Sequence, residues 1–214
     1  MKRLKVIKHA ILVIAVILSN GFSKSIAQTS EVVIGTQTWM SENLNVEHYR
    51  NGAIIPQVQD KNEWSNLNTG AWCYYENDSI KGKTFGKIYN WYAVNDSRGL
   101  APEGWHTASD TEWTQLISYL GDYLVAGGKL KDERFWETPN TGATNESGIS
   151  VLPSGLRYDS GDFNFIGVFA YFWSCSESDN ETSWVRLLSY KNTVVFRLNS
   201  YKRDGLSVRC IKDN

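Results

Sequence analysis

The chain has 214 residues, and its 42% hydrophobic and 21% charged content exclude a disordered or collagen-like protein. It carries 22 basic and 23 acidic side chains, but five of the basic ones and none of the acids lie in residues 1–27, which leaves the other 187 residues with a net charge of −6. Phosphate backbones attract clustered cations, so this acidic balance argues against a nucleic-acid partner.

Residues 1–27 are predicted to be a signal peptide. The basic stretch from Met1 to Lys8 precedes an apolar run of nine residues, Ala10 to Leu18, and Ser25-Ile26-Ala27 supplies the small residues of a cleavage site. The alternative is a membrane-spanning helix, but nine residues reach only about 14 Å, roughly half of a bilayer core. We therefore expect cleavage after Ala27, no membrane span in the mature chain, and a protein that is secreted or held at the cell surface.

Residues 28–214 are interpreted as one domain, because no repeat, low-complexity tract or linker divides them. The first expected elements are two short β segments around Gly35 within residues 31–40, and a strand at residues 71–75. A helix is expected over residues 87–94, where apolar side chains recur at helical spacing.

The next helix has the clearest pattern. Ser109 and Glu112 form a capping box, an apolar stripe begins at Trp113, and Gly121 is expected to end the helix. The chain then changes to short strand-like runs separated by turns, and these cover residues 148–158, 169–176, 183–190, 193–200 and 205–211. Helices first and strands later predict the α+β class, with helices packed on an antiparallel sheet.

Catalytic motifs are absent from the sequence, and we predict no cofactor and no metal site. It has no glycine-rich phosphate loop, no nucleophile elbow and no zinc-binding pattern. His106 is interpreted as a hydrogen-bonded structural imidazole, and nothing in the spacing pairs Cys175 with a histidine as a nucleophile. The acidic run Glu177–Glu181 offers oxygen ligands for a cation, but it lacks the spacing of a calcium loop and is interpreted as a solvated turn.

The aromatic residues divide into two groups. Trp39, Trp91, Trp113 and Trp173 lie in apolar patterns and are predicted to be core. Other aromatic residues lie in or beside polar turns, where a ring and a nearby carboxylate suit stacking on a sugar or contact with a protein; the alternative is local packing. The predicted ligand-binding residues are Tyr158, Asp159, Asp162, Phe163, Tyr190 and Tyr201.

Several motifs occur in a familiar order along residues 31–212: 33–44, 89–94, 101–106, 126–131, 139–148, 172–174 and 205–210. Together they resemble the Fibrobacter succinogenes major paralogous domain family. The resemblance implies a secreted or surface-attached bacterial protein with no established biochemical activity.

A more distant similarity concerns the fold. Residues 104–113 resemble the RLPTEAEWE segment of formylglycine-generating-enzyme-like domains, and residues 205–210 resemble their GFR strand. The resemblance implies a C-type-lectin-like fold, in which two main helices pack on short, mostly antiparallel strands and the N- and C-terminal strands pair. The copper-binding cysteine pair of the formylglycine enzymes and the calcium-dependent sugar motifs of true C-type lectins have no counterpart here, so neither activity is implied.

Three cysteines, Cys73, Cys175 and Cys210, lie in the exported part, where disulfides can form. An odd number allows at most one internal bridge, and the residues alone leave open a pairing of Cys210 with Cys73 or Cys175, or three buried thiols. Members of the family often carry cysteines at the sites of Cys73 and Cys210 together. The resemblance therefore implies a Cys73–Cys210 bridge, with Cys175 free and buried.

These observations lead to one main expectation about function. We expect a secreted or cell-surface, non-catalytic binding module, whose ligand is a carbohydrate or another surface protein. One alternative is a secreted carbohydrate-active enzyme that uses a pair of Asp or Glu side chains. The other is a purely structural adhesion component.

Overall fold

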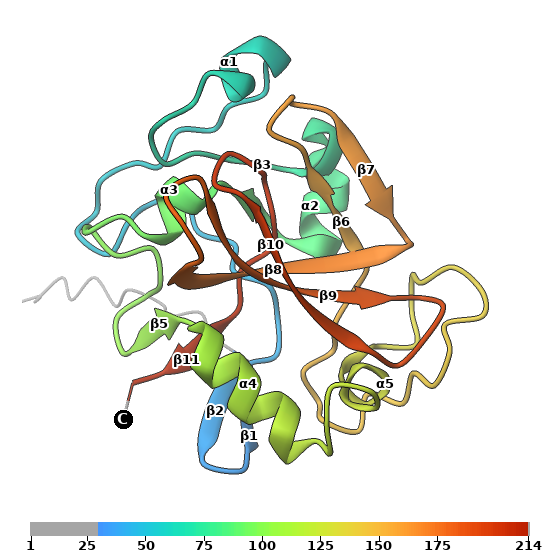
Figure 1. Ribbon diagram of the computed structural model, residues 1–214. Coiled ribbons are helices and arrows are strands. Elements are labelled where there is room, and N and C mark those ends of the chain that lie inside the picture. The colour runs from blue at the N-terminus through green and yellow to red at the C-terminus, as the bar shows by residue number, and fades with distance from the viewer. Residues whose placement is uncertain (1–29, 214) are drawn as a thin grey trace, which may run out of the picture.

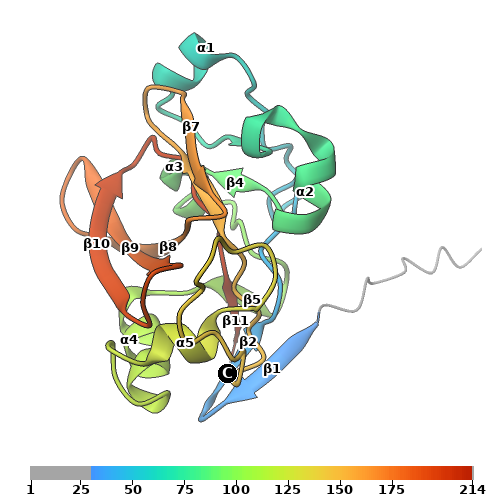
Figure 2. The same ribbon diagram turned by 90° about the vertical axis from the view of Figure 1, so that its right-hand side faces the viewer.

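Short strands make up most of the regular structure, as Figures 1 and 2 show from two sides. The computed structural model describes residues 30–213. The strands are β1 (Glu31–Ile34), β2 (Gln37–Met40), β3 (Trp72–Cys73), β4 (Ile88–Tyr89), β5 (Trp105–Thr107), β6 (Ser154–Arg157), β7 (Phe163–Ile166), β8 (Phe169–Glu177), β9 (Thr182–Ser189), β10 (Val195–Tyr201) and β11 (Cys210–Lys212). They form a four-stranded sheet in the order β1-β2-β11-β5, a five-stranded sheet in the order β10-β9-β8-β6-β7, and the pair β3-β4.

The helices are few and short. They are α1 (Lys61–Ser65), α2 (Ser79–Phe85), α3 (Trp91–Val94), α4 (Asp110–Tyr119), α5 (Ala126–Leu130) and the 3-10 helix η1 (Tyr75–Asn77). Strand pairing is antiparallel except for the contact of β6 with β8. The α+β class with mostly antiparallel strands is thus confirmed. Within residues 30–213, no helix is long and apolar enough to cross a membrane.

The two ends of the described chain meet in the four-stranded sheet. Ile211 of β11 lies opposite Trp39 of β2 on one side and opposite His106 of β5 on the other. The predicted pairing of the N-terminal and C-terminal strands is therefore confirmed. The strand-like runs expected at residues 183–190 and 193–200 form a hairpin, in which β9 and β10 are antiparallel neighbours with Leu188 opposite Val195.

Helix α4 follows the sequence prediction closely. The Ser109 hydroxyl accepts a hydrogen bond from the Glu112 backbone N–H at 3.3 Å, and the Glu112 carboxylate accepts one from the Ser109 backbone N–H at 2.8 Å. This reciprocal capping box satisfies two backbone donors that the first helical turn leaves free. The side chains of Trp113 and Leu116 are fully buried on the face that packs against the sheets.

The predicted helix over residues 87–94 is wrong in its first half. Ile88 and Tyr89 form β4 and pair with β3, and the helix begins only after Asn90. The reason is the Asn90 side chain, whose oxygen accepts hydrogen bonds from the Ala93 N–H at 3.1 Å and the Ala71 N–H at 2.9 Å. It caps α3 and at the same time holds Ala71, directly before β3. The helix therefore starts after Asn90, although the helical spacing of apolar residues begins earlier, in β4.

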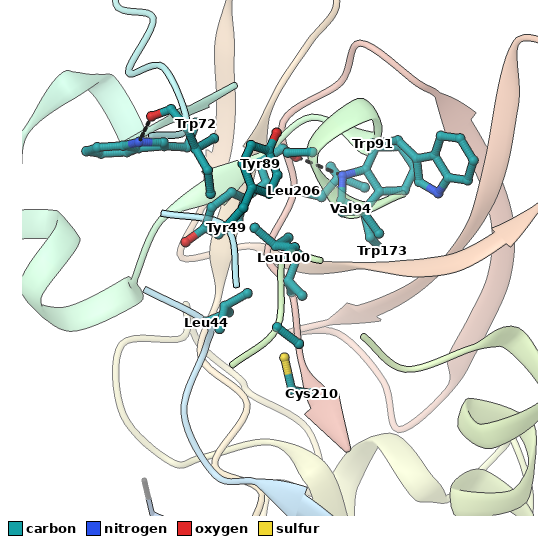
Figure 3. Close-up of a cluster of buried hydrophobic side chains, with 14 of the residues drawn as sticks. Leu44, Tyr49, Trp72, Tyr89, Trp91, Val94, Leu100, Trp173, Leu206 and Cys210 are labelled. Carbon is teal, nitrogen blue, oxygen red and sulfur yellow. Dashed lines mark hydrogen bonds between the residues drawn. The ribbon is translucent and has the colours of Figure 1, made fainter. Parts of the chain in front are cut away.

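The centre of the molecule is a tryptophan-rich core, part of which Figure 3 shows. Trp91 donates its indole N–H to the Ser174 carbonyl at 3.0 Å, and Trp173 donates to the Tyr89 carbonyl at 2.8 Å. Each large ring therefore fills apolar space while its polar atom is satisfied. Trp39 and Trp113 pack together in a neighbouring cluster, with ring centroids 4.8 Å apart. The prediction that these four tryptophans are core is confirmed.

The predicted Cys73–Cys210 disulfide is wrong, because all three cysteines are free. Cys73 lies on β3, in a small cluster with Trp64 and Ile88, whereas Cys210 lies on β11, in the central core of Figure 3. Their strands belong to different sheets. Burial raises the pKa of both thiols to about 12, so both are protonated apolar groups at neutral pH. Cys175 is free, as expected, but only half-buried.

Candidate functional site

A polar cleft of about 510 Å³ opens beside α2. Its walls come from residues 41–45 after β2, residues 82–86 of α2 and its following turn, and the loop segments 134–135 and 150–152, together with Arg209. Figure 2 shows α2 and β2 on one side of the molecule and β10 on the other. Loops held by a rigid scaffold are common positions for binding groups, and this cleft is formed mainly by loops.

Arg209 is the buried cation of the cleft, and its side chain is only 1% exposed. Its guanidinium donates to the Asn43 side-chain oxygen at 2.8 Å and to the carbonyls of Met40 at 2.9 Å, Ile149 at 2.8 Å and Ser150 at 3.2 Å. These bonds use four of its five N–H groups and include no carboxylate. Burial lowers the pKa of Arg209 to about 9, because the loss of water around the charge outweighs the opposing effect of the Glu42 carboxylate.

Three further charged side chains line the cleft. Lys83 and Glu42 are exposed and form no ion pair with another residue in 30–213. Arg134 is paired with Asp132, with its Nε 2.9 Å from the carboxylate oxygen. The lining therefore carries three cations and one carboxylate.

Phe135 is the exposed aromatic ring of the cleft. Its side chain is 54% exposed, although its ring packs edge-on against Phe85 at a centroid distance of 5.6 Å. The guanidinium of Arg134 lies over this ring as well, 5.9 Å from its centroid. The backbone of Phe135 has φ of 69°, in the left-handed region that a bulky side chain adopts only at a cost of about 1–3 kcal/mol.

Several neutral polar groups in the cleft remain available to a ligand. The hydroxyls of Ser41 and Thr84, and the side-chain amide N–H groups of Asn45, make no hydrogen bond with another residue in the described part of the chain. Asn45 is held in place because its side-chain oxygen accepts a hydrogen bond from Lys87 at 2.6 Å. Fixed donors of this kind suit a ligand rich in hydroxyl groups.

The predicted ligand-binding residues lie away from this cleft. Tyr158, Asp159 and Asp162 share the turn between β6 and β7, where the Tyr158 N–H donates to the Asp162 carbonyl at 2.8 Å. The Asp162 carboxylate accepts a hydrogen bond from Lys61 at 2.5 Å, which holds its pKa below the usual value. This turn lies at the surface, and its polar groups are largely bonded to one another.

The remaining predicted residues are spread over the molecule. Phe163 is half-buried against Tyr75, with ring centroids 5.3 Å apart. Tyr201 is 53% exposed at one end of β10 and lines a small polar hollow of about 230 Å³. Tyr190 lies at the opposite end of the β9–β10 hairpin, partly buried against the core. The structure therefore does not gather the six residues into one site.

Asp204 joins two of the predicted regions. Its carboxylate accepts hydrogen bonds from the Asp159 N–H at 2.7 Å and from the Ser200 hydroxyl near Tyr201. The residue is only 4% exposed, and burial raises the pKa of its carboxyl to about 6, helped by the negative charge of Asp159.

His106 is a structural imidazole, as predicted. Its Nδ1 lies 2.6 Å from an Asp213 oxygen, and its Nε2 lies 2.7 Å from a Glu112 oxygen. Burial lowers the pKa of His106, but the hydrogen bonds to the two carboxylates outweigh this effect and raise it overall. Because both ring nitrogens are bonded, His106 is not placed to act as a base for Cys175, whose own thiol pKa is raised by burial.

Two carboxylates of the acidic run Glu177–Glu181 already have partners in the protein. Asp179 accepts hydrogen bonds from the backbone N–H groups of Glu181 and Thr182, both at 2.8 Å, and Glu177 pairs with Lys202 at 2.6 Å. Among residues 30–213, no group of three or more His, Cys, Asp or Glu side chains is arranged to hold a metal ion.

A second hollow, of about 490 Å³, is mainly apolar. It lies between the end of α4 and the edge strand β10, where Tyr123 and Phe196 are 58% and 37% exposed. Its polar groups include the Ser118 and Tyr123 hydroxyls and the Nε–H of Arg186, which has no hydrogen-bond partner among residues 30–213.

The residues that line the polar cleft were not predicted from the sequence. Arg209 lies in the closing motif of the family resemblance, and Phe135 follows a charged run at residues 131–134, but neither pattern indicates a ligand by itself. Arg209 and Phe135 line the same cleft because loops that are far apart in the chain pack together.

Comparison with known proteins identifies the family. No curated protein and no solved structure is similar enough to this chain to match it. A family model does match, over residues 32–212, and confirms the resemblance carried by the sequence motifs. The chain therefore belongs to the family described as the Fibrobacter succinogenes major domain.

Proposed function

We propose that this protein is an exported, non-catalytic binding module that holds a carbohydrate in the polar cleft beside α2. The observation that carries the proposal is Phe135, an exposed aromatic ring in a strained backbone conformation at a polar cleft. A strained residue persists where the surrounding structure holds it, and such positions often serve a ligand. A sugar ring presents C–H groups that stack on an aromatic face and hydroxyls that bond polar side chains.

The polar groups of the cleft support a ligand rich in hydroxyls. Ser41, Thr84 and Asn45 carry free hydrogen-bonding groups around the space beside Phe135. The hollow between α4 and β10 has a mainly apolar lining, and its two arginines, Arg186 and Arg197, are already paired with Asp110. A carbohydrate therefore fits the cleft better than it fits the apolar hollow.

The charges of the cleft support binding rather than hydrolysis. Glycosidases generally use two carboxyl groups separated by about 5–9.5 Å. The residues lining this cleft include one carboxylate, Glu42. The chemistry of the lining therefore favours a module that binds a glycan without cleaving it.

We also propose a C-type-lectin-like fold for the domain. The pairing of β2 with β11, which brings the chain ends into one sheet, supports this assignment. So does the position of α4 directly after β5, in the segment that resembles formylglycine-generating-enzyme-like domains. An experimental structure in which the order β1-β2-β11-β5 has no equivalent in that fold would overturn it.

The test of the proposed function is a glycan array followed by titration calorimetry on the best ligand. Phe135→Gly should weaken binding by about fivefold or more, taking the about 1–3 kcal/mol that a nucleic-acid base gains by stacking on an aromatic side chain as a guide. Glycine adopts φ of 69° without strain, which should offset the lost contact with Phe85. A denaturant melt of the variant separates loss of binding from unfolding.

Two matched variants locate the ligand. Tyr201→Ala removes a comparably exposed ring from the smaller hollow, and Tyr123→Ala removes one from the apolar hollow. Both should leave glycan affinity unchanged. An array without any hit, or affinity that depends on Tyr201 instead of Phe135, would contradict the proposal, and release of a shortened sugar would show an enzyme.

A further inference from the structure

The cleft beside α2 has an uncompensated positive charge. Arg209 is buried without a carboxylate partner, and Lys83 forms no ion pair with another described residue. The charge of Arg134 is already offset by Asp132, which leaves Glu42 as the acid facing two unpaired cations. The rest of the protein is acidic, so this positive cleft differs from the chain as a whole.

Arg209 retains one hydrogen-bond donor. A guanidinium has five N–H groups, and four of those on Arg209 donate to Asn43, Met40, Ile149 and Ser150. The fifth, on Nη2, has no partner among the described residues, and Arg209 is part of the cleft lining. A buried cation with a free N–H is stabilised by an anion that enters beside it, because the interaction is weakly screened there.

We propose that the cleft selects acidic carbohydrates, in which a sugar-ring carboxylate of the uronic acid type lies against Arg209 and Lys83 while the ring contacts Phe135. This inference rests on the proposed carbohydrate-binding function and adds the charge of the ligand. The depressed pKa of Arg209 supports it, since a bound carboxylate would raise that pKa again.

The test compares acidic oligosaccharides with carboxyl-reduced copies of the same chains. Oligogalacturonate and oligoalginate are titrated into the full mature protein, and each reduced form keeps the sugar backbone but lacks the charge. The acidic form should bind at least about tenfold more tightly, and the difference should shrink in high salt.

Equal affinity for both forms overturns the charge selectivity and leaves carbohydrate binding intact. If neither form binds, while a neutral glycan binds in a way that depends on Phe135, the charge selectivity is likewise wrong. If no glycan binds at all, both proposals are wrong.

Charge variants at the cleft rim test the same inference without disturbing the core. Lys83→Gln should weaken binding of the acidic form by about fivefold, whereas Glu42→Gln should strengthen it by a similar factor. Lys191→Gln makes the same charge change at an exposed site on the β9–β10 turn and should have no effect. A gain of affinity in Glu42→Gln cannot arise from damage to the fold. Weakening in both rim variants, or in Lys191→Gln, would contradict a local electrostatic role.

Discussion

Asp204 shows how a single buried side chain links distant turns of this protein. Its carboxylate bonds the Asp159 N–H in the β6–β7 turn and the Ser200 hydroxyl in β10. This aspartate is more easily protonated than a free one, because burial disfavours its charge by more than the hydrogen bonds from these partners favour it. Residues of this kind determine how the fold responds to pH.

The pH dependence of Asp204 has a definite sign. Its pKa of about 6 in the folded state lies above the value of about 3.9 in an unfolded chain. The group therefore contributes stability below pH 4, and about 2–3 kcal/mol of it is lost as the pH rises from 4 to 6. Urea unfolding of the wild type and Asp204→Asn at pH 4 and pH 7 checks this. The advantage of the wild type should fall by that amount, and a constant or growing advantage would contradict it.

At the scale of elements, local patterns predicted α4 well because its signals are local. The capping box and the apolar stripe both lie within the helix, and the structure satisfies both. The same kind of pattern gave a wrong prediction of a helix from residue 87, because Ile88 and Tyr89 pair with β3 in spite of their helical spacing. Strand β7 was not predicted, because Phe163 was assigned to the aromatic residues in or beside polar turns.

Helix α4 also gives a graded stability prediction. Ser109→Ala should lower the free energy of unfolding by about 1 kcal/mol, because the Glu112 N–H loses its side-chain acceptor. Trp113→Ala should cost about 3–5 kcal/mol, because Trp113 is fully buried against Trp39 and Phe172. Thr111→Ala, on the exposed face of the same helix, is the control and should change little. Denaturant melts measure all three, and equal losses for Ser109 and Trp113 would mean that the core is misassigned.

At the scale of the whole molecule, the candidate site depends on contacts that no local pattern contains. Arg209 joins the end of β2 to the segment at residues 149–150 through the carbonyls of Met40 and Ile149. The cleft exists because that link holds its loops beside α2. The sequence predicted exposed aromatic residues at turns, and this favoured Tyr158 and Tyr201. It contained no indication that Phe135 and Arg209 line the same cleft, since long-range packing decides this.

The three free cysteines lead to a prediction about the stability and thiol reactivity of the whole molecule. A Cys73–Cys210 bridge would close a loop of about 137 residues and contribute about 5 kcal/mol in the chain-entropy model. With all three thiols free, the stability comes from the core and the pairing of β2 with β11. The unfolded protein should therefore react with three equivalents of a thiol reagent, and a reductant should not shift its melting temperature. In the native protein Cys175 should react first, because it is half-buried whereas Cys73 and Cys210 are fully buried. A single reactive thiol after unfolding without reductant would show instead that two of the cysteines are bridged.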